Sequence, residues 1–546
     1  MVQSSATVAP GATPADVVIV GGGLAGLFTA LKFGDRPVTL LAAAPLGEGS
    51  GSAWAQGGIA AAVGVGDSAE KHAADTVAVG VGLTDPAVAL SVVSDGPDRI
   101  SDLLSYGVPF DRDLAGALVL SREAAHSERR VVRVNGDLAG KAIIAALIAA
   151  VRATPTIRVV EGLVAERLVL AAGRVAGLEA RRAEAPDLGV LFFPARAVVL
   201  ATGGIGQLYG VTTNPVEACG HGLGLAARAG AVVADAEFVQ FHPTALDFGK
   251  DPALLATEAL RGEGSWLVNR AGERFMLARH PLAELAPRDV VARGVFAEVT
   301  SGRGAFLDTR PALGDAIESH FPTFFANCLE AVLDPRREPI PVVPAEHYHM
   351  GGLLTDARGR TSIPGLWACG EVASTGLHGA NRLASNALLE SVVFGARVAA
   401  DICTLPPAAL GSGRAEHPAS DAPAITPPEA ARRLAGLRAL MSRCVGVVRD
   451  GDGLAEALTE LAALDALPLS ERDRNRLAAA KLVTAAAWNR RESRGAHCRA
   501  DCPAGDPALA RRTRLTLGEA DALVSTFKDP EPDDGSLAGT LAEGPK

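Results

Sequence analysis

The sequence lacks the positive charge that binding to nucleic acid or to an anionic membrane surface requires. It has 52 basic residues against 62 acidic ones, a formal net charge of −10, and no block of Lys or Arg. Contact with phosphate groups depends on clustered cations. We therefore expect neither nucleic acid nor a membrane as a partner.

Paired cysteines and long apolar runs are also missing. The seven cysteines are scattered singly, and an odd number does not make a disulfide framework. Cys498 and Cys502 are the only close pair, and no second ligand pair at zinc spacing accompanies them, so we expect no metal site. Residues 1–15 have neither the basic nor the apolar region of a signal peptide. These absences predict a cytoplasmic protein whose residues 1–15 form a disordered tail.

The first informative feature that is present is a strand followed by a glycine-rich turn. Residues 16–20 have the apolar character of a buried strand, and residues 27–33 that of a helix. Glycines between them let the backbone approach an anion, and the helix N-terminus offers free N–H groups. This order predicts a bound dinucleotide, and the alternative is an ordinary tight turn. The residues expected at its pyrophosphate are Gly21, Gly22, Gly23, Leu24, Ala25 and Gly26.

Two further strand-and-glycine motifs end at residues 201–204 and 365–371, and a charged, less regular segment separates them. A Pro-, Ala-, Ser- and Gly-rich stretch follows, and beyond it the apolar periodicity is helical without strand signals. We predict an α/β fold in which a Rossmann-like domain is interrupted by an α+β capping domain and followed by a C-terminal helical bundle. The predicted ranges are 16–238 and 351–404 for the nucleotide-binding domain, 239–350 for the capping domain, 405–427 for a linker, 428–525 for the helical domain and 526–546 for a flexible tail.

Long motifs in the predicted insert and beside it identify a family. They occupy residues 240–244, 257–264, 287–293, 347–352 and 376–386. Together with the three glycine motifs, they resemble the succinate dehydrogenase/fumarate reductase flavoprotein family over most of residues 16–400. The resemblance implies that the nucleotide is FAD.

Three features resemble the aspartate-oxidising branch of that family. The loop at residues 121–127 is similar to its substrate-discriminating loop, residues 491–499 are similar to its C-terminal segment, and residues 53–58 lack the histidine that attaches FAD covalently in respiratory relatives. The resemblance implies non-covalent FAD and oxidation of L-aspartate to iminoaspartate, with hydride transfer to flavin N5. Oxygen, giving H2O2, or fumarate would reoxidise the flavin. This reaction opens NAD biosynthesis through quinolinate, and a transient encounter with quinolinate synthase is a reasonable hypothesis.

The resemblance also implies which residues handle the substrate. A dicarboxylate calls for Arg forks and for imidazole or hydroxyl donors. The family positions are occupied by His242, Thr257, His347 and Arg382, by Arg288 as the proton-transferring arginine, and by Glu258 as a candidate for orientation or a proton path. The high solution pKa of arginine makes it a poor base. A role that fits Arg288 better is electrostatic: it would hold the α-carboxylate and stabilise charge in the transition state. For Glu258 with Arg261, a structural ion pair is the alternative.

Glu123 has a physical rationale of its own. A carboxylate near the substrate ammonium gains a charge-assisted hydrogen bond, whereas the same group repels succinate. The alternative is a surface ion pair with Arg122 or Arg129. His126, in the same loop, has a weaker claim to assist.

The remaining cofactor contacts follow from the resemblance. On the flavin side we expect Ser52, Gln56, Gly57 and Gly58, at the ribityl hydroxyls Glu371, and near the pyrimidine end Asn386, Ala387 and Leu388. Three positions depart from the family pattern: His221 replaces an Asp, Ala387 a Ser, and Ala43 a Lys or acid. Each departure removes a side-chain contact to FAD. The alternatives to this aspartate-oxidising branch are a fumarate reductase or succinate dehydrogenase flavoprotein subunit, and a flavin-binding protein without catalysis.

Overall fold

A five-stranded parallel sheet forms the centre of the nucleotide-binding domain in this computed structural model, which describes residues 7–8, 16–134, 138–406, 420 and 422–527. The strand order is β18-β11-β2-β3-β7. Strand bounds are β2 Val17–Val20, β3 Val38–Ala42, β7 Ile157–Glu161, β11 Ala197–Leu200 and β18 Leu366–Ala368.

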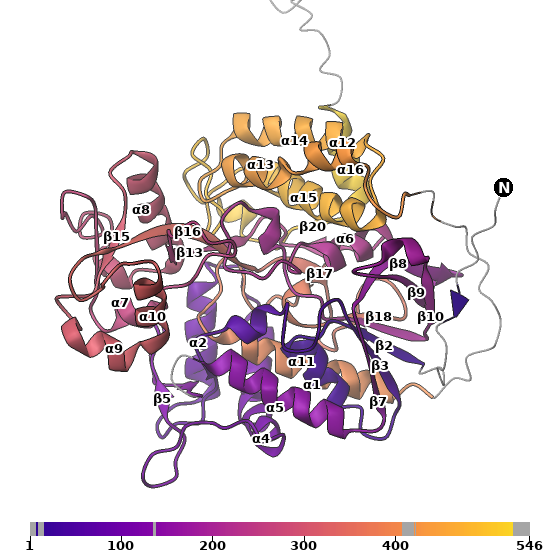
Figure 1. Cartoon of the computed structure of the whole chain (residues 1–546), viewed down its shortest axis with the longest axis horizontal. Coiled ribbons are helices and arrows are strands. Elements are labelled where there is room, and N and C mark those ends of the chain that lie inside the picture. The colour runs from indigo at the N-terminus through magenta and orange to yellow at the C-terminus, as the bar shows by residue number, and fades with distance from the viewer. Residues whose placement is uncertain (1–6, 9–15, 135–137, 407–419, 421, 528–546) are drawn as a thin grey trace, which may run out of the picture.

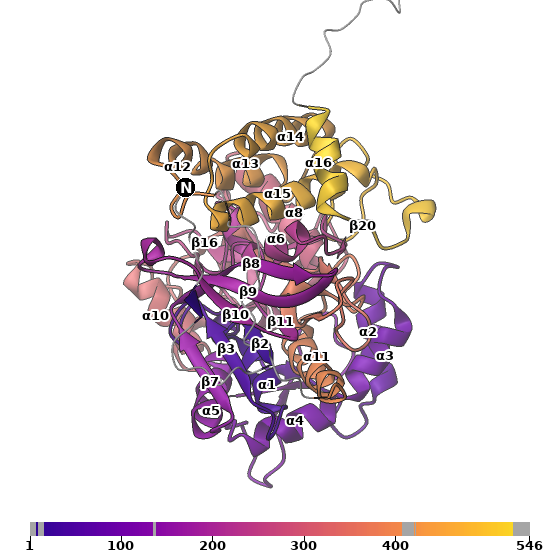
Figure 2. The same cartoon turned by 90° about the vertical axis from the view of Figure 1, so that its right-hand side faces the viewer.

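Both faces of this sheet are buried, as expected for parallel strands whose sequences are continuous runs of apolar residues. Val17 and Ile19 of β2 pack among helices on one face, whereas Val18 and Val20 pack toward the β8–β10 layer on the other. The covering elements are α1 Leu24–Leu31, α5 Ala139–Ala153, α11 Asn386–Cys403, β8 Leu163–Ala171, β9 Arg174–Arg182 and β10 Leu191–Pro194 (Figure 2). The short strand β1, Thr7–Val8, pairs with β10 inside the segment predicted to be a disordered tail; the other residues of 1–15 lie outside the described residues.

Smaller elements complete this domain. A three-stranded sheet, short strands of two or three residues between residues 233 and 374 and four more helices surround the central sheet. They are β4 Ile59–Ala60, α2 Ala69–Val79, α3 Pro86–Ser94, α4 Gly96–Ser105, β5 Leu120–Ser121, β6 Val131–Val132, α6 His221–Arg228, β12 Val233–Ala234, β17 Gly352–Leu354 and β19 Ala373–Ser374.

The insert forms a separate lobe beside the sheet (Figure 1). An antiparallel sheet of order β13-β16-β15-β14 carries helices around it, and a distinct apolar cluster fills the lobe. The bounds are β13 Val239–Leu246, α7 Glu258–Gly262, β14 Trp266–Val268, α8 Arg288–Thr300, β15 Phe306–Asp308, α9 Ile317–His320, α10 Pro322–Glu330 and β16 Ile340–His349. The predicted fold class, an α/β nucleotide-binding domain interrupted by an α+β cap, is confirmed.

The C-terminal helices lie across the nucleotide-binding domain (Figure 1). They are α12 Pro428–Leu434, α13 Leu437–Cys444, α14 Gly451–Asp465, α15 Glu471–Asn489 and α16 Leu517–Ser525. One element departs from the helical prediction: β20, Arg514–Leu515, pairs with β12 and joins its sheet. Most of the predicted linker and of the predicted tail at 526–546 lies outside the described residues. Among the described helices, none is both long and apolar enough to cross a membrane.

Candidate active site

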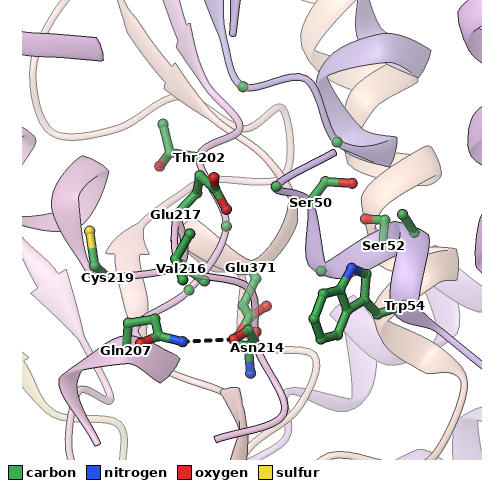
Figure 3. Close-up of a pocket in the computed structure, with 18 of the residues that line it drawn as sticks. Ser50, Ser52, Trp54, Thr202, Gln207, Asn214, Val216, Glu217, Cys219 and Glu371 are labelled. Atoms are coloured by element: carbon green, nitrogen blue, oxygen red, sulfur yellow. Dashed lines mark hydrogen bonds between the residues drawn. The ribbon is translucent and has the colours of Figure 1, made fainter. Parts of the chain in front are cut away.

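One large cavity, of about 1230 Å³, runs between the nucleotide-binding domain, the cap and the C-terminal helices. Figure 3 shows Ser50, Ser52 and Trp54 along one wall and Thr202 and Gln207 on the opposite side. The cavity begins at the turn between β2 and α1 and extends to the cap. The predicted site residues of the cap that line it are His242, Thr257, Glu258, Arg288 and His347. A dinucleotide and a small substrate could therefore share it.

The turn between β2 and α1 has the geometry of a pyrophosphate cradle. Gly21 has φ +124°, and a Cβ there would lie 2.1 Å from the carbonyl oxygen of Ala201. A Cβ on Gly26 would lie 1.9 Å from the Gly21 oxygen, so this glycine lets the helix pack against the turn. No side chain caps α1 at Gly23. The Leu24 N–H donates to Ser52 Oγ at 3.4 Å, and the N–H groups that follow it at the helix N-terminus can face an anion.

Unpartnered polar atoms give a second indication that the cavity is built for a polar ligand. Within the described part of the chain, Ser50 Oγ, Gln56 Oε1, Thr202 Oγ1 and Glu217 Oε2 are buried without a hydrogen-bond partner, and all four residues line the cavity. Buried polar groups are nearly always paired in native proteins. Hydroxyl, amide and carboxylate groups of this kind, beside a glycine cradle, fit the ribityl and phosphate groups of FAD.

Most residues expected at the cofactor line this cavity. They are Gly21, Gly22, Gly23, Leu24, Ala25, Ser52, Gln56, Gly57, Gly58, His221, Glu371, Ala387 and Leu388. Gly26 and Asn386 do not. Gly26 serves the packing of α1, and the Asn386 side chain is turned into the protein, where it bonds His72 Nε2 at 2.8 Å and Thr76 Oγ1 at 3.0 Å.

Of the three departures from the family pattern, His221 has a hydrogen-bond partner of its own within the described residues. His221 Nε2 donates to the carbonyl oxygen of Ala165, and burial lowers the pKa of His221 to about 4, so the ring is neutral. Ala43 also lines the cavity. The Glu371 carboxylate accepts the His349 backbone N–H at 3.0 Å, and burial raises the pKa of Glu371 to about 7. That acid can change its charge near neutral pH.

Two arginines meet at the end of the cavity next to the cap. Arg288, at the start of α8, donates Nε–H to Glu258, and Arg382 stacks on the Tyr348 ring with its Cζ 4.5 Å from the centroid. Gln240 Oε1 accepts from Arg382 at 3.0 Å and from Arg288 at 3.3 Å. Burial, together with the charge of Arg288, lowers the pKa of Arg382 to about 10, which leaves it a cation at neutral pH. The pair offers two positive charges to a dianion.

Two histidines from neighbouring strands complete this end. The rings of His242 on β13 and His347 on β16 lie 5.1 Å apart. His242 Nδ1 accepts the Thr244 backbone N–H at 3.2 Å, which leaves Nε2–H as the donor. Burial and nearby arginines lower the pKa of both rings well below 6.5. Neutral imidazoles can therefore offer hydrogen bonds to a ligand, while the arginines can offer charge.

Thr257 and Glu258 begin the short helix α7. Thr257 Oγ1 accepts the Ala259 N–H at 3.5 Å, and both Thr257 and Glu258 line the cavity. Arg261 does not line it; its NH1 donates to the Glu284 oxygen at 2.6 Å. Although burial opposes ionisation, the charges of Arg288 and Arg261 lower the pKa of Glu258. Glu258 is thus an ion-pair partner that also faces the cavity.

Glu123 lies at the same cavity and not in a surface ion pair. Its Oε2 accepts from Ser385 Oγ at 2.9 Å, whereas Arg122 donates to the His126 carbonyl. Burial raises the pKa of Glu123, against the charge of Arg288. His126 does not line the cavity; its ring bonds the backbone oxygen of Ala384 at 3.0 Å.

Three residues that hydrogen-bond to the predicted site residues were not themselves predicted from the sequence as part of the site. Gln240 joins the arginines, Ser385 holds Glu123, and Thr213 Oγ1 bonds His347 Nδ1 at 2.9 Å. Gln240 stands two residues before His242, and alternation along a strand could have placed both on one face. Ser385 and Thr213 give no such local signal.

Comparison with known proteins places these features in a family. The FAD binding domain family matches residues 16–388, and the family described as fumarate reductase flavoprotein C-term matches residues 471–523. The solved Escherichia coli quinol fumarate reductase superposes with a TM-score of 0.81 at 29% identity, covering 91% of this chain and 93% of that chain. Fold, cradle and matching families therefore define an FAD-binding flavoprotein of the fumarate reductase type.

Curated relatives narrow this class. An L-aspartate oxidase of Caulobacter vibrioides is 53% identical over 504 residues, covering 92% of this chain and 96% of the relative. An L-aspartate oxidase of Streptomyces coelicolor is 44% identical over 558 residues, covering 96% and 95%. The chain belongs to the L-aspartate oxidase family.

Proposed function

We propose that the chain catalyses the FAD-dependent oxidation of L-aspartate to iminoaspartate. The observation that carries this proposal is the convergence of Arg288, Arg382, His242, His347 and Glu123 on the cavity that begins at the glycine cradle. Two cations and two neutral donors suit a dicarboxylate, and one carboxylate suits its ammonium group. The relatives named L-aspartate oxidase support the same substrate.

The residues hold the substrate at both ends. Arg382 and the two imidazoles bind the side-chain carboxylate, and Arg288 binds the α-carboxylate and stabilises charge that develops as the Cα hydrogen leaves. The ion pair with Glu258 orients the Arg288 guanidinium. Thr257 supplies a further hydroxyl at the cavity wall. We propose that the proton released by the substrate leaves the site along Arg288, Glu258 and Arg261.

Glu123 determines which dicarboxylate is accepted. Its carboxylate accepts a hydrogen bond from the ammonium of aspartate, while succinate presents no donor and adds a like charge. The substrate ammonium must lose a proton before the imine can form. The Glu123 carboxylate is placed to hold this ammonium until it does.

FAD would be held without a covalent bond by the glycine cradle, by Ser52 and Gln56, and by Glu371. Bound FAD supplies a two-electron acceptor at flavin N5, which O2, giving H2O2, or fumarate restores. Residues 50–58 contain no histidine for covalent attachment. This absence and Glu123 favour an oxidase over a respiratory flavoprotein subunit.

The reaction would be the first step of NAD biosynthesis through quinolinate, in the cytoplasm. Iminoaspartate hydrolyses readily, so quinolinate synthase would have to consume it in a transient encounter. Co-purification at low salt and the yield of quinolinate in a coupled assay test this encounter. Absence of association together with no gain in coupled yield would refute it.

The activity itself is tested by adding L-aspartate to the FAD-reconstituted protein in air. We expect equal amounts of H2O2 and of oxaloacetate, the hydrolysis product of iminoaspartate. Formation of neither product, with fumarate also ineffective as acceptor, would refute the proposal.

A further inference from the structure

Among the described residues, one oxygen of the Glu123 carboxylate accepts a hydrogen bond. Oε2 accepts the Ser385 hydroxyl at 2.9 Å. Oε1 lies against Gly57, where a Cβ would approach it to 2.6 Å, so a side chain at this position would displace the carboxylate. The orientation of Glu123 therefore depends on Ser385 and on the space left by Gly57.

Ser385 in turn has an unusual backbone conformation. Its φ is +61°, in the left-handed region that a non-glycine residue adopts only when its surroundings hold it there. Neighbouring segments hold it there. Ala60 N–H donates to the Ser385 carbonyl at 3.4 Å, and the Asn386 side chain is anchored on α2 through His72 and Thr76.

His126 holds the preceding residue, Ala384. Arg130 NH1 lies 3.3 Å from His126 Nδ1, and a guanidinium only donates, so Nδ1 is the acceptor and Nε2 carries the hydrogen. Nε2–H then donates to the Ala384 oxygen at 3.0 Å. Burial lowers the pKa of His126 to about 4, so the ring stays neutral at physiological pH.

Arg130 is fixed by two carboxylates. Its side chain is 0% exposed; Asp67 accepts two bonds of 2.9 Å from it, and Asp75 accepts a third. The guanidinium thus sets the tautomer of His126. A continuous path of hydrogen bonds leads from Asp67 through Arg130 and His126 to the backbone at residue 384, one residue before Ser385.

We propose that Ser385 and His126 are positioning residues for substrate discrimination. Ser385 holds Oε2 of Glu123 so that Oε1 is presented to the ammonium of an amino dicarboxylate, and His126 holds the backbone that carries Ser385. The inference rests on the proposed function, because it assumes that Glu123 meets the substrate ammonium. It assigns part of the discrimination to a hydroxyl and a buried imidazole that act through Glu123.

The test compares L-aspartate as substrate with succinate as competitive inhibitor. In Ser385→Ala we expect the KM for aspartate to rise roughly tenfold, the effect of one charge-assisted hydrogen bond, while the Ki of succinate stays within about twofold. His126→Leu should also raise the KM for aspartate. His126→Gln keeps an N–H donor, so its KM should stay close to the wild-type value. Ser442→Ala, which removes a serine hydroxyl from α13, is the matched control.

A double-mutant cycle separates positioning from general damage. In a Glu123→Gln background, Ser385→Ala should have no further effect on the ratio of aspartate KM to succinate Ki. The inference would be overturned if Ser385→Ala changed this ratio equally in the wild-type and Glu123→Gln backgrounds. It would also be overturned if Ser385→Ala changed the aspartate KM and the succinate Ki by the same factor. If His126→Leu does not fold, the Ser385 variants still decide. A wild-type protein that does not oxidise aspartate would instead refute the proposed function.

Discussion

The side-chain oxygen of Gln240 accepts a hydrogen bond from Arg382 at 3.0 Å, deep inside the protein. The same oxygen accepts from Arg288 at 3.3 Å. The Gln240 amide nitrogen donates to Asn381 and to the Arg382 carbonyl, which leaves the oxygen no freedom to turn away. A neutral acceptor thereby holds two like charges at one end of the cavity.

Replacing Gln240 with leucine tests this arrangement. Without the acceptor the two guanidinium groups repel each other without compensation, and the substrate carboxylates lose their aligned partners. We expect kcat/KM for aspartate to fall by about 10- to 100-fold, since hydrogen bonds to charged groups contribute about 1.5–3 kcal/mol. FAD affinity, measured by fluorescence titration, should be unchanged. Wild-type kinetics in Gln240→Leu would contradict the arrangement.

A second prediction concerns the buried charge of Glu258. In Glu258→Gln, Arg261 would keep a fully buried charge beside a neutral neighbour, and Arg288 would lose its ion pair. Breaking a buried pair costs about 3–5 kcal/mol, so both the melting temperature and kcat should fall. Glu128→Gln, which breaks an exposed pair with Lys71, is the control and should leave calorimetric melting unchanged.

FAD binding should depend on pH through Glu371. Its pKa is about 7, and accepting ribityl hydroxyls favours the ionised carboxylate. Below pH 7 the acid must first release a proton, so FAD affinity should fall by up to about tenfold per pH unit. Titrations between pH 6 and 8 should show this slope in the wild type and no slope in Glu371→Gln. The same slope in the variant would assign the ionisation elsewhere.

A buried ion pair joins the C-terminal helices to the nucleotide-binding domain. Arg490 Nε lies 2.5 Å from Glu237, and the two side chains are 2% and 0% exposed. Arg490→Met leaves Glu237 buried and without its cation, which should destabilise the protein by about 3–5 kcal/mol. Arg443→Met, which breaks a pair between exposed side chains, is the control. Equal melting of both variants would show that the buried pair does not hold the contact.

Local chemistry explains what the sequence could predict. The strand, the glycine turn and the helix at residues 16–31 follow from backbone conformation and apolar periodicity, which neighbouring residues determine. The substrate residues were predictable only through the family motifs, because His242, Arg288 and Arg382 approach one another from separate elements. Their positions in one cavity depend on the complete fold.

Other features depend on partners that are distant in sequence. The strand β20 has two residues and exists because β12, about 280 residues earlier in the chain, offers a free edge. The side chain of Asn386 was expected near the cofactor, yet His72 and Thr76 turn it inward. Ser385 gives no sign of its left-handed conformation, since the contacts that hold it come from His126 and Ala60. Tertiary contacts of this kind leave no periodic signal.

The central claim is tested most directly by anaerobic reduction of the flavin in FAD-reconstituted protein. L-Aspartate should bleach the flavin absorbance, succinate should not, and Arg288→Leu should bind FAD but remain unbleached by aspartate. Bleaching by succinate with none by aspartate would contradict the account and place the chain with the respiratory flavoproteins.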